Sequence, residues 1–189
     1  MRILLIGANG RTGMRLKAIN KDHQLVDFIG DFRDGDTVEK FLPNIDAVLC
    51  VVGHVKGSSK NVQSEGINTL ISKMQKFGIG RIVMLTGTGV RLPGDKITLI
   101  DRVLNFGVKL VDPNRVSDGI ESTKILTNSK LEYTVLRVLK LTNGKPKLNW
   151  KLSENGPTIS FVSRDSVALA LFECLDKRYS RQCPMMTRK

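Results

Sequence analysis

The chain has 189 residues, 41% of them hydrophobic, which suits one folded domain over residues 1–189 with a substantial core. Its net charge is +12, but the basic residues are scattered and aromatic residues are few, so we expect a basic solvated surface without dedicated nucleic-acid binding. No apolar run reaches the roughly 18 residues of a membrane helix, and the three cysteines form no C-x-x-C pair. We therefore expect a cytoplasmic protein with reduced thiols and no membrane partner.

The first thirteen residues carry the most informative motif. Residues 3–6 form an apolar run that predicts a buried strand, and Gly7, Gly10 and Gly13 follow it directly. A strand, a glycine-rich turn and a helix in this order place backbone N–H groups at a helix N-terminus, where a pyrophosphate binds. Glycine is needed because a side chain would block the tight turn or the approach of the phosphates. The spacing G-x-x-G-x-x-G favours a nucleotide site over a merely tight turn.

Apolar runs and helical periodicity alternate along the rest of the chain. We expect further strands at residues 25–30, 45–53, 81–86 and 133–138; the second of these is nearly all apolar, as in a parallel sheet covered on both faces. This order predicts a single, doubly wound α/β domain of Rossmann type with a parallel sheet. The expected helices run from Asp34 or Asp36 to Leu42, from Ser58 or Ser59 to Gly78, and over residues 97–106, 116–127 and 163–175.

The carboxyl ends of the predicted strands are the expected ligand site. In open parallel sheets, ligands bind at these ends, near the point where the strand order reverses. Glycine follows several of the strands directly, which fits backbone lying against a flat ligand, although glycine ends many strands for other reasons. The residues expected to contact a cofactor are Gly7, Asn9, Gly10, Arg11, Thr12, Gly13, Asp31, Phe32, Arg33, Val52, Gly53, His54, Leu85 and Thr86.

Six stretches carry a family resemblance: residues 7–13 (Gly-Ala-Asn-Gly-Arg-Thr-Gly), 30–34, 46–53, 64–68, 80–86 and 124–137. In their order and spacing they resemble the atypical short-chain dehydrogenase/reductase group, specifically the NAD(P)H-binding (NmrA-like) family that includes biliverdin/flavin reductase. The resemblance implies a Rossmann-type fold that binds NADP(H), with NAD(H) as the less favoured cofactor. It also implies hydride transfer to a small-molecule substrate.

The first β-α-β unit departs from the family pattern. Only 16 residues lie between Gly13 and Gly30, so this unit is shortened. By resemblance, residues 17–30 lead into the third strand and the second strand is missing. By spacing alone, residues 25–30 are the second strand. Both interpretations place Asp31 at the adenosine end of a cofactor, and Arg11 and Arg33 are the nearest cations for a 2′-phosphate, although either is equally well explained as a surface charge.

The catalytic residues depart from the pattern as well. Many short-chain reductases use Tyr-x-x-x-Lys, in which the lysine lowers the pKa of the tyrosine so that it can exchange a proton. Neither tyrosine here has a lysine four residues on, and the resemblance places the pair at Arg115 and Gly119. A lone histidine is more often a satisfied side chain than a catalyst. The possible substitutes are Thr86, Thr88, His54 and Lys124, of which Thr86 and Lys124 are our catalytic candidates, each also explicable without chemistry.

Other chemistries are disfavoured by missing motifs. The sequence has no metal-ligand spacing, no G-K-[ST] ending to the glycine loop and no G-x-S-x-G elbow. Two hypotheses remain: a reductase with a small planar or carbonyl acceptor such as a flavin or quinone, or a non-catalytic protein that senses the redox state of the cofactor. A third is a remnant whose shortened first unit no longer binds cofactor.

Overall fold

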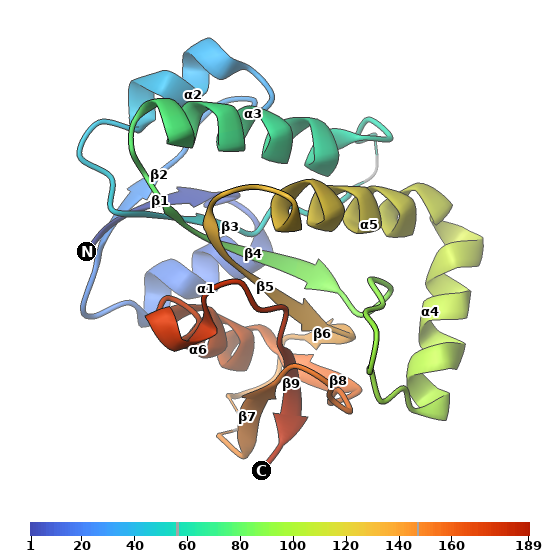
Figure 1. Cartoon of the computed structure of the whole chain (residues 1–189). Helices are drawn as coiled ribbons and strands as arrows, with labels where there is room; N and C mark the ends of the chain where they lie inside the picture. The colour runs from blue at the N-terminus through green and yellow to red at the C-terminus, as the bar shows by residue number, and fades with distance from the viewer. Residues whose placement is uncertain (56, 147) are drawn as a thin grey trace.

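A seven-stranded sheet forms the centre of the molecule (Figure 1); the computed structural model describes residues 1–55, 57–146 and 148–189. The strand order is β2-β1-β3-β4-β5-β9-β7, and all neighbours are parallel except the antiparallel pair β7 and β9. A separate parallel pair joins β6 and β8. The strands are β1 (Arg2–Ile6), β2 (Gln24–Asp27), β3 (Ala47–Cys50), β4 (Arg81–Gly87), β5 (Glu132–Val138), β6 (Lys140–Thr142), β7 (Trp150–Ser153), β8 (Phe161–Ser163) and β9 (Met185–Arg188).

Helices cover both faces of the sheet. In Figure 1, α2, α3 and α5 lie above it, α1 and α6 lie below it, and α4 stands upright at one edge. This arrangement confirms the predicted α/β class with a mostly parallel sheet. The helices are α1 (Arg11–Ile19), α2 (Gly35–Phe41), α3 (Val62–Lys76), α4 (Leu99–Val111), α5 (Pro113–Thr127) and α6 (Arg164–Glu173), with a short 3₁₀ turn at Lys177–Tyr179.

Two hydrophobic cores result from the alternation of side chains along the strands. Leu4 and Ile6 of β1 belong to the core under α2, α3 and α5, whereas Ile3 and Leu5 belong to the core against α1 and α6. Successive strand residues point to opposite faces, so a strand covered on both sides must be apolar at every position. The continuous apolar runs of the sequence therefore mark the central strands.

The second strand exists and lies beside β1. Residues of β2 pair in parallel with β1 from Arg2 opposite Gln24 to Leu5 opposite Asp27. As the spacing interpretation predicts, the second strand of the chain lies in this segment, although it ends earlier than expected, at Asp27. No strand lies beyond β2 among the described residues, so the sheet stops there. The first unit is short: α1 has 9 residues and β2 has 4.

The strand order reverses between β1 and β3. The chain passes from β1 to β2 on one side and then to β3 on the other, giving the doubly wound order 2-1-3-4-5. Ligands of such sheets bind outside the carboxyl ends of the two strands that flank this switch point. Here these ends are adjacent, since the amide of Val51 donates to the carbonyl of Ile6 at 2.9 Å.

Several elements differ from the sequence predictions. The third strand is shorter than the expected 45–53, α4 runs to Val111 where 97–106 was expected, and α5 begins at Pro113. The short strands β6 to β9 were not predicted. No helix among the described residues is long and apolar enough to cross a membrane.

Candidate functional site

The glycine loop after β1 is packed so closely that side chains are excluded. Gly7 has a φ of +89°, and its carbonyl accepts a hydrogen bond from the amide of Gly10 at 3.0 Å. A Cβ on Gly13 would lie 2.2 Å from that same carbonyl oxygen and 2.7 Å from the carbonyl oxygen of Ala8. A Cβ on Gly7 would lie 3.2 Å from the backbone of Val51 in the neighbouring segment. The motif thus brings α1, the loop and the end of β3 into direct contact.

The N-terminus of α1 is available to an anion. Its N-cap residue is Gly10, no side chain caps it, and its first turn holds no acidic residue. The first-turn amides therefore keep the partial positive charge that binds phosphate groups at helix N-termini. Arg11 begins the helix and Asn9 is exposed in the loop, whereas Thr12 is buried. A backbone cradle that only glycine fits, beside free helix amides, suits the pyrophosphate of a dinucleotide.

A basic corner adjoins this helix N-terminus. Arg164, the first residue of α6, is buried and donates to the side-chain oxygen of Asn143 at 2.5 Å. Burial lowers the pKa of Arg164, and the nearby cations Arg11 and Arg15 lower it further. Three guanidinium groups thus lie around the ends of α1 and α6, and Asp165 pairs with Arg15 at 3.3 Å. Neither Arg164 nor Asn143 was predicted as a site residue.

Asp31 and Arg33 form a tight pair beyond the end of β2. The Arg33 guanidinium donates to both carboxylate oxygens of Asp31, at 2.9 and 2.5 Å, and also to Ser59 at 3.1 Å. Hydrogen bonds from the side chain and the backbone of Arg33 hold the pKa of Asp31 below its ordinary value. Glu65 lies 3.4 Å from the same guanidinium. The two residues predicted for the adenosine end are therefore adjacent and exposed, and Arg33 is oriented by three acceptors.

Phe32, between these two residues, turns inward. It is 4% exposed and belongs to the core under α2 and α3, where its ring fills the space next to Gly66. A Cβ on Gly66 would lie 2.1 Å from that ring. The side chain of Phe32 thus anchors the loop in the core and is not available for the predicted contact with a cofactor. Leu85 is likewise a core residue, whereas Val52 is half-buried and Gly53 is exposed with open space around its Cα.

His54, just after β3, is held by a carboxylate from α5. Its Nε2 lies 2.7 Å from Oδ2 of Asp118, and the two side chains are 4% and 0% exposed. The same carboxylate accepts the backbone amides of Gln63 at 2.8 Å and Ser64 at 2.9 Å, in the first turn of α3. Burial alone would raise the pKa of Asp118, but hydrogen bonds from Ser64, Gln63 and His54 lower it. An ionised Asp118 therefore caps α3 and fixes the ring of His54.

The positions of the missing Tyr-x-x-x-Lys pair lie over the ends of β3 and β4. Arg115 donates to the backbone oxygen of His54 at 3.4 Å. A Cβ on Gly119 would lie 3.2 Å from the hydroxyl of Thr86 at the carboxyl end of β4. Thr86, His54 and the two α5 positions are thus brought together, as expected for residues at the strand ends. A lysine side chain at position 119 would meet the Thr86 hydroxyl directly.

Lys124 does not lie with Thr86 and His54 at the carboxyl ends of the strands. It is exposed in the last turn of α5, more than one turn beyond Gly119, where the chain leaves the helix for the amino end of β5. The structure groups Thr86 with the strand ends but gives Lys124 no contact with it. Lys124 therefore remains a prediction without geometric support.

The loop between β4 and α4 is tied down by buried polar groups. Arg137 of β5, fully buried, binds both carboxylate oxygens of Asp95 at 2.6 and 3.0 Å. Thr88 accepts from the side-chain amide of Asn105 in α4 at 3.0 Å. Because both ends of the loop are bonded to the body of the protein, the residues after Thr86 have defined positions.

Two alternative kinds of ligand site, a metal site and a pocket at the amino ends of the strands, have less support among the described residues. In the described part of the chain, no three His, Cys, Asp or Glu side chains are grouped to hold a metal ion. A hollow at the amino ends of the strands is lined by Met1, Gly80 and Glu132. It lies at the opposite edge from the glycine loop, where parallel sheets do not place their ligands.

Comparison with known proteins shows the family to which the chain belongs. A sequence model described as NAD(P)H-binding matches residues 7–178. The chain belongs to the NAD(P)H-binding family. No curated protein matches the sequence significantly. The match confirms the resemblance to the NAD(P)H-binding family, and it covers the glycine loop, the Asp31–Arg33 pair and the His54–Asp118 contact together.

Solved structures with the same fold include proteins described as dehydrogenases or reductases. A short-chain dehydrogenase/reductase from Veillonella parvula in complex with NADP has a TM-score of 0.77 at 17% identity, covering 99% of this chain and 94% of that one. The anaerobilin reductase ChuY from Escherichia coli gives 0.75 at 20% identity, covering 100% and 97%. The oxidoreductase ylbE from Lactococcus lactis gives 0.79 at 17% identity, covering 100% and 91%. At these identities the likeness shows the Rossmann-like fold.

Proposed function

We propose that this NAD(P)H-binding protein is an NADP(H)-dependent reductase that passes hydride to a small planar or carbonyl acceptor of the flavin or quinone type. The observation that carries the proposal is the glycine cradle. Gly7 and Gly13 leave no room for side chains, and the uncapped amides of α1 point out beside them. Such a cradle at the switch point of a parallel sheet serves a dinucleotide pyrophosphate.

Each part of the site has a role in this proposal. The amides of α1 and the Arg11 guanidinium hold the pyrophosphate, and the hydroxyl of Thr86 hydrogen-bonds the nicotinamide half at the end of β4. The bound nicotinamide supplies the hydride. Asp118 positions His54 at the end of β3, beside the place where an acceptor would lie. A flavin or quinone takes its proton from water, so this chemistry does not require Tyr-x-x-x-Lys.

The preference for NADP(H) over NAD(H) is assigned to Arg33. In Rossmann-type folds, an acidic residue at the position that Asp31 occupies here holds the ribose hydroxyls of NAD, and a nearby arginine accommodates the 2′-phosphate of NADP. Here the guanidinium of Arg33 neutralises Asp31 through hydrogen bonds to both carboxylate oxygens, which removes the repulsion that a lone carboxylate would exert on a phosphate. The pairing therefore supports NADP(H), with NAD(H) as the less favoured cofactor.

A titration with NADPH and NADH, followed by nicotinamide fluorescence and calorimetry, tests the proposal. We expect tighter binding of NADPH, and loss of that preference in Arg33→Ala, because the variant leaves Asp31 unpaired. Lys40→Ala is the matched control, since Lys40 is an exposed cation of the adjoining α2. Absence of binding by either nucleotide would refute the proposal and favour a remnant without cofactor.

A non-catalytic sensor of the cofactor's redox state is the second candidate. The observation that favours it is the replacement of the usual Tyr and Lys by Arg115 and Gly119 over the strand ends. Turnover of NADPH with a panel of flavins and quinones separates the two functions. Consumption of NADPH that depends on the acceptor establishes the reductase. Tight binding without turnover favours the sensor.

Two broader proposals accompany this function. Residues 1–189 are proposed to form one domain, because β9 inserts between β5 and β7 and so joins the last part of the chain to the sheet. A cytoplasmic location is supported by three free, buried thiols, of which burial raises the pKa of Cys50 to about 11. Limited proteolysis tests the first proposal, and cell fractionation tests the second.

A further inference from the structure

Helix α4 is attached to the protein by its polar side. Asp101 is 1% exposed and accepts hydrogen bonds from Arg91 and from the side-chain amide of Asn105, both at 2.5 Å. Asn105 also donates to Thr88 in the loop after β4. Helices of globular proteins normally bury an apolar stripe and expose the polar one. In α4 this arrangement is reversed.

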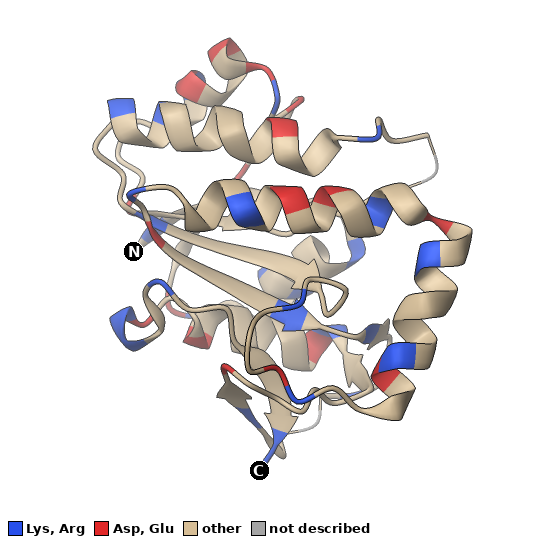
Figure 2. Cartoon of the chain, turned by 45° about the vertical axis from the view of Figure 1, so that its right-hand side comes forward, with Lys and Arg blue, Asp and Glu red and all other residues tan. Residues whose placement is uncertain are grey.

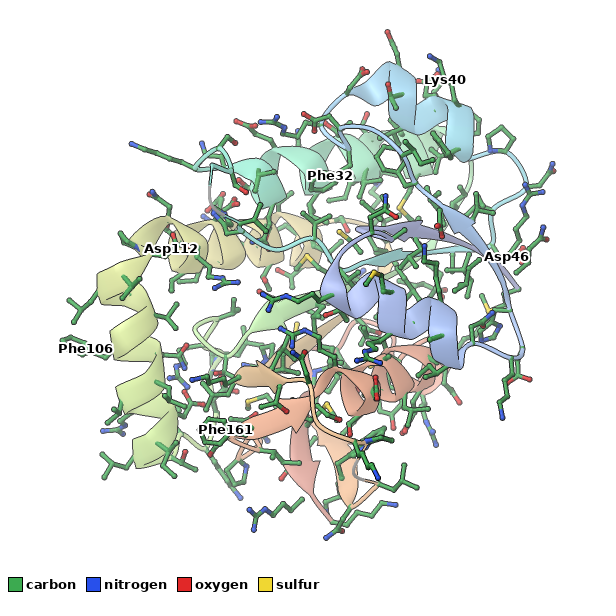
Figure 3. All side chains as sticks on the ribbon, turned by 180° about the vertical axis from the view of Figure 1, so that it is seen from behind. Phe32, Lys40, Asp46, Phe106, Asp112 and Phe161 are labelled. Atoms are coloured by element: carbon green, nitrogen blue, oxygen red, sulfur yellow. The ribbon has the colours of Figure 1, made fainter. Side chains whose placement is uncertain are left out.

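The apolar side of α4 is left in solvent. Leu99, Val103, Phe106 and Leu110 recur at spacings of four, three and four residues, so they form one stripe along the helix. They are 78%, 61%, 64% and 69% exposed. Ile100 and Val111 widen the stripe, and in Figure 3 Phe106 points away from the body of the protein.

The exposed charges on α4 itself are positive, and the next carboxylate along the chain, the half-buried C-cap residue Asp112, accepts the backbone amide of Arg115 in α5. Lys96, Arg102 and Lys109 are exposed in or next to the helix (Figure 2), and Asp101, the one acidic residue of the sequence between 96 and 111, is buried against Arg91. The whole chain carries a net charge of +12. A protruding apolar helix flanked by basic residues has the composition of helices that lie in the interface of anionic membranes.

We propose that the exposed face of α4 docks on an anionic lipid surface. Leucine, isoleucine, valine and phenylalanine side chains would enter the boundary between headgroups and acyl chains, and Arg102 and Lys109 would contact the lipid phosphates. A second copy of this chain is a poorer occupant, because pairing two α4 helices would bring their cations together with no exposed carboxylate on either helix to neutralise them. Because α4 stands at the edge of the molecule (Figure 1), its exposed stripe is on an accessible side of the protein, as contact with a lipid surface requires.

This contact is peripheral and goes beyond the proposed function. The expectation of no membrane partner rested on the absence of long apolar runs. A helix that lies on a membrane does not need the length of one that spans it, so that absence does not exclude membrane contact by α4. The bond from Asn105 to Thr88 links the back of α4 to the loop that follows Thr86. Docking would therefore hold the carboxyl edge of the sheet near the lipid headgroups, whether or not the site turns over NADPH.

Vesicle co-sedimentation tests the proposal without any cofactor. Wild-type protein is mixed with vesicles of phosphatidylcholine alone or with added phosphatidylglycerol, at low and at high salt. We expect binding to the anionic vesicles that weakens in salt. The double variant Phe106→Ser/Leu110→Ser should bind at least about tenfold more weakly, since two exposed apolar side chains leave the lipid. Arg102→Glu/Lys109→Glu should lose the preference for anionic vesicles.

Matched controls decide whether the effect belongs to α4. Ile29→Ser/Leu148→Ser removes two side chains that are each 69% exposed elsewhere and should bind vesicles as wild type does. All variants alter exposed residues, so circular dichroism and melting temperature should remain those of wild type. Three results would overturn the proposal: no binding to anionic vesicles at low salt, an equal loss in the control, or a wild-type dimer in light scattering that Phe106→Ser/Leu110→Ser converts to monomer.

Discussion

Replacing Gly13 by alanine isolates the packing of the cofactor cradle. Gly13 lies in the first turn of α1, and Gly107 lies inside α4 with nothing within 4 Å of an added Cβ. Alanine in a helix interior is favoured over glycine by about 1 kcal/mol, so helix propensity alone predicts that both variants are stabilised. At Gly13, however, the new Cβ would lie 2.2 Å from the carbonyl oxygen of Gly7 and 2.8 Å from the carbonyl carbon of Ala8.

Both of these neighbours are backbone atoms, so the clash cannot be relieved by turning a side chain. The helix and the loop must separate, and overpacking of this kind costs about 1–3 kcal/mol. We therefore expect Gly13→Ala to be destabilised and Gly107→Ala to be neutral or stabilised. Because the displacement also moves the amides of α1 from the pyrophosphate, NADPH should bind Gly13→Ala about tenfold or more weakly, a change of about 1.4 kcal/mol.

Chemical denaturation and fluorescence titration with NADPH measure the two effects separately. Gly107→Ala should keep wild-type affinity, since α4 has no part in the cradle. If Gly13→Ala unfolds at the same denaturant concentration as wild type and binds NADPH equally well, then α1 and the loop are not packed as described, and the assignment of the cradle fails.

Further predictions concern the polar groups around the site. Asp118→Ala should lower the free energy of unfolding by about 2–4 kcal/mol in denaturant titrations, because two α3 amides and His54 lose their acceptor. The folded pKa of Asp118 is lowered, so its contribution to stability is present above the ordinary aspartate pKa of about 3.9 and is lost as pH falls through the lower folded value. Asp118→Asn should therefore make the free energy of unfolding less dependent on pH in the acid range. An unchanged pH dependence would contradict this. Asp95→Ala should cost about 3–5 kcal/mol by leaving Arg137 buried without its carboxylate; a variant that melts like wild type would show that the pair is not buried. Thr86→Val should leave NADPH affinity within a few-fold and reduce kcat with a quinone acceptor; an unchanged kcat would remove Thr86 from the nicotinamide end.

Local sequence patterns predict the parts of the fold that are built from local interactions. The central strands are recognisable because parallel strands with two covered faces are continuously apolar, as in β3. The strands β7 and β9 escape prediction because each is defined by its partner: Trp150 pairs with Arg188, far along the chain. Neither strand has a long apolar run or a turn that would bring the two together. Their pairing depends on the tertiary structure.

The candidate site divides in the same way. The glycine loop and Asp31 follow from spacing within one β-α unit. Asp118 does not, because its partner His54 lies 64 residues earlier in the chain. One signal was present: Asp118, Ser122 and Leu126 recur every fourth residue on the buried side of α5. A carboxylate on a core-facing helix stripe needs hydrogen-bond donors from another segment, and that requirement is a reason to suspect a site.

The insertion of β9 between β5 and β7 constrains the order in which the sheet assembles. In the described sheet, β7 stands at the edge and its hydrogen-bonded neighbour is β9, which follows it in the chain. The strands β1 to β5 can each pair with a strand that is already in the sheet when they follow in chain order. In contrast, β7 can join the sheet only after β9, its neighbour, has paired with β5. The segment from β6 to α6 must therefore be carried as a long loop while the rest of the sheet forms, and closing such a loop is a slow, non-local step. A substitution that weakens β9 would release two strands of the sheet together.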